Sequence, residues 1–417
     1  MRSDNSLLLE CHFRREAAGG AQGEAGVAMP GPNRVYLDHA STTPLHPEVR
    51  EAMLPYLGDR FGNPSSPNLP GRLARRVVDQ ARERVAALLG AHFEEILFTG
   101  SASEANNLAL KGIAGAARRA GGHLVAASTE HASILHPLRT LSRQGFRTTL
   151  LPVDEVGMLR ADRLEEALDD GPLLVSIAHA SPEIGTVQPL KEICARAQAR
   201  GVVVHTDATV TAGLLPWPTA PPSPDLITVT PHLFYGPPGI GALRVREGIR
   251  LAPLIEGGRQ EGGLRAGTES LAAIAGFGAA AALAVRRRQQ WATRASRLAK
   301  RMLKRLQPRS AGMLLTGHPT ERVPGLVTLC CRGIEAEALL QALQEEGIDA
   351  SSGSACTTEV GKSSHVLEAL GIEPLLARGA LTLSFGEANG DSDPDRVADL
   401  LPRLVTRLRN LSPLERS

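Results

Sequence analysis

From Val35 onward, short apolar runs alternate with longer segments in which apolar residues recur every three or four positions. The runs cover residues 96–99, 124–127, 173–177, 202–204, 226–229 and 241–245. Amphipathic helical patterns such as Leu73–Leu89 and Leu190–Arg200 lie between them. Apolar strands separated by helices indicate an α/β fold with a mostly parallel sheet that helices cover on both faces. We therefore look for chemistry at the carboxyl ends of the strands, where such sheets bind ligands.

The two ends of the chain differ from this middle part. Residues 1–33 are rich in Gly and Ala without a sustained period, which predicts a flexible extension. A long basic helical pattern follows Val285 and runs to Gln307, and a shorter α/β stretch occupies the rest. This organisation predicts a second, smaller α/β domain in the C-terminal part.

Composition excludes several classes of protein. The 417 residues include 46 basic and 44 acidic side chains, so the net charge of +2 implies neither a nucleic-acid partner nor an acidic one. Five Cys without paired short spacing argue against a disulfide-rich module. The longest apolar stretch, Leu271–Val285, is too short to cross a bilayer, and no export signal is visible. We expect a cytoplasmic protein without membrane contact.

The basic helical pattern allows two interpretations. Ten Lys and Arg residues gather between Arg286 and Arg309, and no acidic residue occurs from Leu271 to Thr320. Such a face can dock an acidic partner or RNA. A solvated helix face is the simpler interpretation, because no aromatic residues other than Trp291 are interleaved.

Three predicted strands end in residues that can carry chemistry. Gly100–Asn107 resembles an anion cradle at a strand-to-helix turn, although a simple serine N-cap gives the same pattern. Asp207 ends a buried strand and can hold a protonated ring nitrogen or cap a helix. His131 follows another strand and can stack on a planar ligand, move protons or fill a structural role.

One cysteine stands out by its surroundings. Cys356 lies in the Gly/Ser-rich segment 351–358, where a thiolate can act as a nucleophile, although an unreactive loop thiol fits the same pattern. Cys11, Cys194 and the pair Cys330–Cys331 lie in settings that suggest no reaction. We predict no metal site from these residues.

These motifs together resemble the NifS/IscS-type cysteine desulfurases, of the class V aminotransferase group of pyridoxal phosphate (PLP) enzymes. The resemblance covers about residues 35–413. It rests on ordered matches at 35–44, 61–66, 129–131, 205–208, 235–237, 264–269 and 351–357. It implies PLP fold type I, with a large domain at 49–290 around a seven-stranded sheet. Residues 34–48 and 291–417 would form the small domain.

The resemblance also implies a role for each matching residue. Cys356 would carry a persulfide taken from L-cysteine, which leaves as alanine, and PLP would act as the electron sink. His131 would stack on the ring and transfer protons, and Asp207 would pair with the ring nitrogen. The phosphate would be held by Ser103, Thr230 and His232, with Thr268 coming from the partner of a homodimer. Fe–S scaffold or sulfur-acceptor proteins would receive the sulfur.

The departures from the family pattern concern its chemistry. The family's lysine, which attaches PLP, is replaced by Leu233, and the chain has only five Lys in all. Lys362, on the segment that carries Cys356, is the candidate to take the place of this lysine. The arginine that clamps the substrate carboxylate is replaced by Thr382, whose hydroxyl cannot make a bidentate contact. Three further family contacts are changed, at Ser181–Pro182, Val210 and Gly262.

Three functions follow from this pattern. The first is cysteine desulfuration for Fe–S cluster assembly, impaired or absent because Leu233 replaces the lysine. PLP would then bind non-covalently or not at all. The second is a catalytically silent scaffold or sulfur relay, in which Cys356 accepts a persulfide or helps to ligate an Fe–S cluster. The third is a regulatory partner of a genuine desulfurase.

Overall fold

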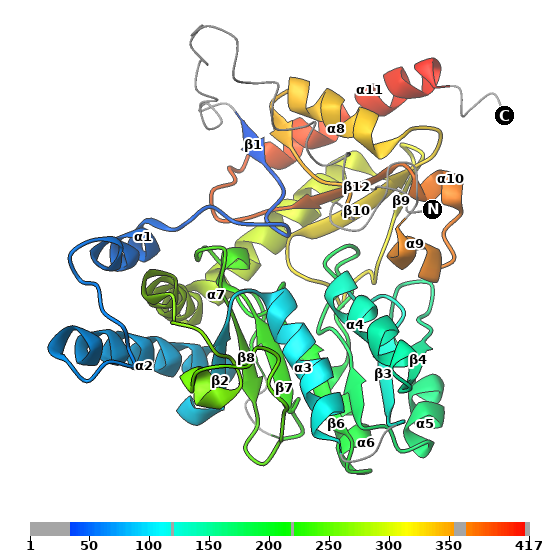
Figure 1. Cartoon of the computed structure of the whole chain (residues 1–417). Coiled ribbons are helices and arrows are strands. Elements are labelled where there is room, and N and C mark those ends of the chain that lie inside the picture. The colour runs from blue at the N-terminus through cyan, green and yellow to red at the C-terminus, as the bar shows by residue number, and fades with distance from the viewer. Residues whose placement is uncertain (1–33, 118–120, 218–220, 354–363, 413–417) are drawn as a thin grey trace, which may run out of the picture. The chain divides into compact units, whose positions relative to one another are not determined.

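The central element of the computed structural model is a seven-stranded sheet (Figure 1). The model describes residues 34–117, 121–217, 221–353 and 364–412. All neighbouring strands are parallel except β8, which runs antiparallel to β2 and β7. The spatial order is β2 (Ile96–Thr99), β8 (Gly241–Val245), β7 (Leu226–Val229), β6 (Val203–Asp207), β5 (Leu174–Ser176), β3 (His123–Ala127) and β4 (Arg147–Leu151). The predicted mostly parallel α/β fold is confirmed.

Six of the seven strands coincide with the apolar runs of the sequence, and β4 does not. This strand lies at the edge of the sheet and pairs only with β3. Its sequence Arg-Thr-Thr-Leu-Leu buries only Leu151 and leaves Leu150 exposed. An edge strand that is largely exposed has no need of an apolar run, so the pattern could not reveal it.

Helices cover both faces of this sheet. Successive strand residues point to opposite faces, so Ile96 and Phe98 pack with α2 and α7, whereas Leu97 packs with α3 and α4. The strands β3 and β5 bury their remaining side chains against α5 and α6. The bounds are α2 (Leu69–Leu89), α3 (Ala102–Ala116), α4 (Ala132–Arg143), α5 (Ala161–Asp169), α6 (Leu190–Gln198) and α7 (Leu271–Leu306), with α1 (Pro47–Met53) preceding them.

A second core forms around two smaller sheets. One is the antiparallel set β12–β10–β9 and the other is the parallel pair β1–β11. The 36-residue helix α7 contributes Trp291 to the first core and residues from Ala295 onward to the second. The other elements are β1 (Val35–Tyr36), β9 (Met313–Leu315), β10 (Leu326–Cys331), α8 (Ala336–Glu345), β11 (Ile348–Asp349), α9 (His365–Ala369), α10 (Pro374–Ala377), β12 (Ala380–Ser384) and α11 (Asp393–Leu411). The domain boundaries given above stay a prediction.

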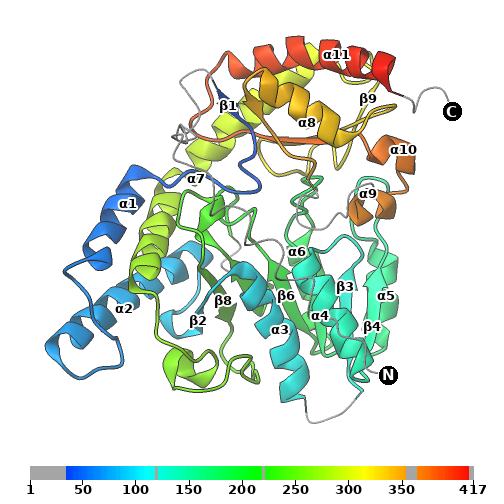
Figure 2. The same ribbon diagram turned by 45° about the horizontal axis from the view of Figure 1, so that its top comes forward.

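Three arginines of the basic pattern on α7 form an arginine stripe: Arg297, Arg301 and Arg305. They pair with aspartates on and just before α11, which lies beside α7 (Figure 2). Both the arginines and the aspartates are spaced by four residues. The paired atoms are 2.7 Å apart for Arg297–Asp391, 2.9 Å for Arg301–Asp395 and 2.6 Å for Arg305–Asp399. These exposed pairs add little stability each, but they neutralise part of the stripe within the chain. This favours the solvated-face interpretation over a docking site for RNA.

In the described residues, no helix combines the length and the apolar character that crossing a membrane requires.

The packing of α2 on α7 depends on Gly278. A Cβ at this position would lie 2.7 Å from the Cα of Ala81 and 2.8 Å from its Cβ. We therefore expect Gly278→Val to lower the free energy of unfolding by about 1–3 kcal/mol, because the helices must move apart. Gln289→Val, at an exposed position of the same helix, should cost less than about 0.7 kcal/mol. Urea denaturation of both variants measures the difference, and equal losses would contradict this view of the interface.

Candidate functional site

The predicted site residues come from segments that end at the same edge of the parallel strands. Asp207 is the last residue of β6, and Thr129–His131 follow β3. Thr230 follows β7, and two residues separate the end of β2 from the start of α3. Because carboxyl ends of parallel strands meet at one edge of a sheet, these residues lie along one edge, where such sheets bind ligands; we call this edge the crevice.

A chain of hydrogen bonds joins Asp207 to His131. The amide of Asn106 donates to Asp207 Oδ2 and to Ser133 Oγ, both at 2.8 Å. Ser133 Oγ lies 2.8 Å from His131 Nδ1, which also accepts the Ser133 backbone N–H at 3.1 Å. Since Nδ1 accepts, the neutral imidazole of His131 carries its proton on Nε2. The structure thus brings the predicted Asp207 and His131 together through two residues that the sequence analysis did not single out.

Both ends of this chain are fixed by local structure. His131 is the N-cap of α4, which explains its bond to the Ser133 N–H. Asp207 is only 8% exposed, and its second oxygen accepts the backbone N–H of Thr209 at 3.0 Å. Asn106 is completely buried. The buried carboxylate is therefore held by hydrogen bonds on both oxygens.

The turn into α3 contains the serine N-cap that the sequence analysis gave as the alternative to an anion cradle. Ser101 caps the helix by accepting the Glu104 N–H at 3.1 Å. A Cβ on Gly241 would lie 2.5 Å from the Ser101 carbonyl carbon, so this glycine lets β8 approach the turn. The Glu104 carboxylate accepts the Gly100 N–H at 2.8 Å and Arg265 Nε at 2.9 Å. Ser103 is exposed on the first turn.

The other predicted phosphate ligands lie in different settings. Thr230 is buried, and its hydroxyl donates to the Ile240 carbonyl at 2.8 Å. His232 is partly buried, and burial lowers the pKa of its imidazole. Thr268 is exposed on the surface of the described chain.

Two buried carboxyl groups escaped the sequence analysis. Glu130 is buried, its Oε1 accepts the Ala178 N–H at 2.9 Å, and its Oε2 has no partner in the described residues. Burial raises the pKa of Glu130 to about 8, and the Asp207 charge adds to this effect. Burial also raises the pKa of Glu183 to about 7, while a hydrogen bond from Ser364 Oγ opposes the shift. The motif Thr129–His131 was the sequence feature that could have identified Glu130 as a site residue.

The positions that depart from the family pattern are integrated into the packing. Leu233 packs on an apolar cluster that includes Val210, Val323 and Leu326. Thr382 is 1% exposed, and its hydroxyl lies 2.8 Å from Thr328 Oγ1. Gly353 covers it so closely that a Cβ there would lie 2.7 Å from Thr382 Oγ1. Apolar or neutral side chains thus occupy the two positions where the resemblance leads us to expect a lysine and an arginine.

The remaining lysines and cysteines add no reactive group to the described crevice. Four lysines fall within the described residues, on α3, α6 and α7: Lys111, Lys191, Lys300 and Lys304. Cys194, Cys330 and Cys331 are buried, and burial raises the pKa of each thiol to about 12. Cys356 and Lys362 lie outside the described residues. Within the described ranges, no group of three or more His, Cys, Asp or Glu side chains is placed to hold a metal ion.

The buried Glu130 predicts a specific pH dependence of stability. With a pKa of about 8, it keeps a proton that the unfolded chain releases near pH 4.5. Stability therefore falls as the pH rises from about 4.5 to about 8. Three buried histidines have pKa values of about 4: His39, His179 and His205. They therefore change the free energy of unfolding with pH only below about pH 6.5.

We expect Glu130→Gln to flatten the stability profile between pH 6.5 and 8, measured by urea denaturation. Glutamine keeps an acceptor for the Ala178 N–H and cannot ionise. Glu183→Gln is the matched control, because the pKa of about 7 confines its effect to the lower part of this range. A slope that is unchanged in Glu130→Gln would show that Glu130 is ionised in the folded chain at pH 6.5.

Comparison with known proteins places this site in a family. Residues 35–397 match the model of the class-V aminotransferases. Cysteine desulfurase IscS 1 of Archaeoglobus fulgidus is 41% identical over 381 residues, 91% of this chain and 99% of that protein. Cysteine desulfurase IscS of Methanosarcina thermophila is 42% identical, over 91% of this chain and 94% of its own length. A solved NifS-like protein superposes with a TM-score of 0.84 at 30% identity, over 90% of this chain and 100% of that chain. The chain therefore belongs to the class-V aminotransferase family, in its group of IscS- and NifS-like cysteine desulfurases.

Proposed function

We propose that this protein takes part in sulfur mobilisation for Fe–S cluster assembly with impaired or absent PLP catalysis, and that Cys356 carries the sulfur as a persulfide. The observation that carries the proposal is the packing of Leu233 on the apolar cluster with Val210, Val323 and Leu326. A leucine has no amine with which to bind PLP covalently and none with which to move a proton. The Asp207–Asn106–Ser133–His131 chain supplies the residues that the family resemblance assigns to the ring of PLP.

The non-covalent contacts of PLP, the cofactor of this family, fit the residues present. Asp207 is a buried carboxylate at a strand end, suited to a protonated ring nitrogen. His131 is partly buried beside it, and Ser103 offers a hydroxyl on the first turn of α3 for the phosphate. When bound, PLP supplies an electron sink for bonds at the substrate α-carbon. The covalent attachment does not fit, since Leu233 occupies the position that the family gives to its lysine.

The residue at the family's arginine position supports weak binding of an amino-acid substrate. Thr382 stands there and offers no positive charge, and its hydroxyl is engaged with Thr328. A substrate carboxylate would therefore find no bidentate cation at this position. This favours a role as a sulfur relay, scaffold or regulatory partner of an active desulfurase over independent turnover.

An exposed apolar surface supports a homodimer. Within one stretch that includes the helix η1 (Leu54–Leu57) and the start of α2, five large apolar side chains are 49–74% exposed. They are Leu54, Leu57, Phe61, Leu69 and Leu73. Exposed apolar side chains gathered in this way indicate an interaction surface. A second copy of the chain is the proposed occupant, and Thr268 would reach the partner's phosphate site.

The sulfur acceptor is proposed by class only. A persulfide on Cys356 would be passed to an Fe–S scaffold or another sulfur-acceptor protein. An Fe–S cluster ligated by Cys356 with a partner remains part of the proposal, as does a cytoplasmic location.

Desulfuration by this chain alone should be close to background. Without the lysine, we expect alanine and sulfide release from L-cysteine to be lower by at least about 10²–10⁴-fold than in a lysine-bearing relative, because general acid–base and covalent roles are lost together. The assay uses the full chain with PLP and a reductant. Cys356→Ala is the control for background sulfide. Rapid turnover that disappears in Cys356→Ala would contradict the proposal.

The proposed dimer predicts a mass twice that of the 44.1-kDa chain in sedimentation. Replacing Leu57 and Phe61 together by Glu should shift the protein toward the monomer, because two charges would be buried without partners. Leu411→Glu is the matched control, since Leu411 is 76% exposed on α11, away from this stretch. A dimer that survives the double substitution would rule out this surface.

A further inference from the structure

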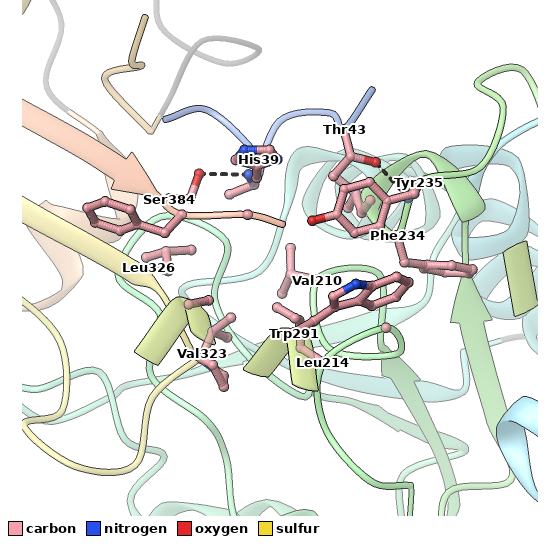
Figure 3. Close-up of a pocket in the computed structure, with 17 residues that line it drawn as sticks. His39, Thr43, Val210, Leu214, Phe234, Tyr235, Trp291, Val323, Leu326 and Ser384 are labelled. Carbon is pink, nitrogen blue, oxygen red and sulfur yellow. Dashed lines mark hydrogen bonds between the residues drawn. The ribbon is translucent and has the colours of Figure 1, made fainter. Parts of the chain in front are cut away.

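A small cavity lies beside the crevice and is lined from six parts of the chain (Figure 3). Its walls come from the β1–α1 connection, the segment after β6, the residues around η3 (Pro231–Leu233), α7, the segment that leads into β10 and the end of β12. The cavity has a volume of about 40 Å³. Since one water needs about 10–15 Å³, the interior holds about three or four non-hydrogen atoms.

The walls are apolar and carry no charged side chain. Among the lining residues are Val210, Leu214, Leu233, Val323 and Leu326, and none is Asp, Glu, Lys or Arg. Two of them, Leu233 and Val210, stand where the family pattern has polar residues. The replacements therefore extend one apolar wall and do not leave isolated defects in a polar site.

One end of the cavity carries buried polar groups whose hydrogen-bonding capacity is not used. His39 is 8% exposed, and only weak contacts with Tyr36 and Asn389 reach its ring nitrogens in the described residues. Trp291 is 3% exposed, and its indole N–H also lacks an acceptor there. In Figure 3 the indole nitrogen faces the side of Val210. Buried polar groups are normally paired, so each of these calls for an acceptor or donor from outside the chain.

The Tyr235 hydroxyl is a third polar group at this end of the cavity. The Tyr235 hydroxyl accepts the Glu387 backbone N–H at 2.7 Å, and its proton is still available to donate. Its ring lies 4.7 Å from that of Trp291 and 6.4 Å from that of His39, measured between centroids. The three polar side chains are thus gathered along one wall.

We propose that this cavity binds a small uncharged molecule of about four non-hydrogen atoms that carries one carbonyl or hydroxyl oxygen. The apolar wall of Val210, Leu214 and Leu233 covers its carbon atoms, and the N–H of Trp291 and the hydroxyl of Tyr235 donate to its oxygen. His39 supplies either a donor or an acceptor. Anions and cations are excluded because burying a charge without a partner is costly. The proposal stands whether or not PLP binds to the crevice.

Acetone and acetate test the proposal, because they have the same size and shape and differ in charge. The full chain is labelled with ¹⁵N-tryptophan, which gives two indole N–H signals, since the chain has two Trp. Trp217→Phe assigns them. We expect acetone to shift the Trp291 indole proton downfield in a saturable manner and to leave Trp217 unmoved. Acetate should bind at least tenfold more weakly.

Filling the cavity should abolish the response. Val210→Phe places a ring in the apolar wall, and Leu214→Phe does so at a partly buried position if the first variant fails to fold. Leu314→Phe is the control, since Leu314 is 40% exposed on β9. The proposal is overturned if acetone moves neither signal, if both signals move in proportion without saturation, if acetate acts equally, or if a filled variant keeps the shift.

Discussion

The arrangement of the crevice depends on one buried amide. Asn106 donates one hydrogen bond to Asp207 and one to Ser133, and Ser133 in turn contacts His131. These three partners come from β6 and from the start of α4, while Asn106 comes from α3. Without the amide, the Asp207 carboxylate would lose a donor in a site where desolvation makes unpaired charge costly.

Around this link, apolar or neutral side chains stand at the two positions where the resemblance leads us to expect cations. Leu233 and Val210 share one apolar cluster, and Thr382 pairs with Thr328 under Gly353. Compensated packing of this kind explains how the chain tolerates the changes without losing the fold. Burial separately raises the pKa of Glu130 to about 8.

The sequence was a good guide to the sheet and to the ends of its strands. Six strands carried apolar runs because they are buried on both faces, whereas the exposed edge strand β4 carried none. The strand order is not encoded in such runs, and the antiparallel β8 looked like its parallel neighbours. Asp207 and His131 were found because each directly follows or ends a strand.

The connections between these residues could not be found in the same way. Asn106 and Ser133 lie 101 and 74 residues before Asp207, and only the folded chain brings them together. No pattern in the sequence distinguishes Glu130 and Glu183 from exposed glutamates, because their burial depends on tertiary packing. Cys356 lies outside the described residues, so its role rests on the family resemblance.

The most direct test of the account is whether PLP becomes covalently attached to this chain. The purified full-length protein is incubated with PLP, reduced with borohydride and digested, and each of its five lysines is examined by mass spectrometry. We expect no site-specific lysine adduct and no visible absorbance band near roughly 400 nm that borohydride removes. A stoichiometric adduct on a single lysine, such as Lys362, would contradict the account and restore the enzyme interpretation.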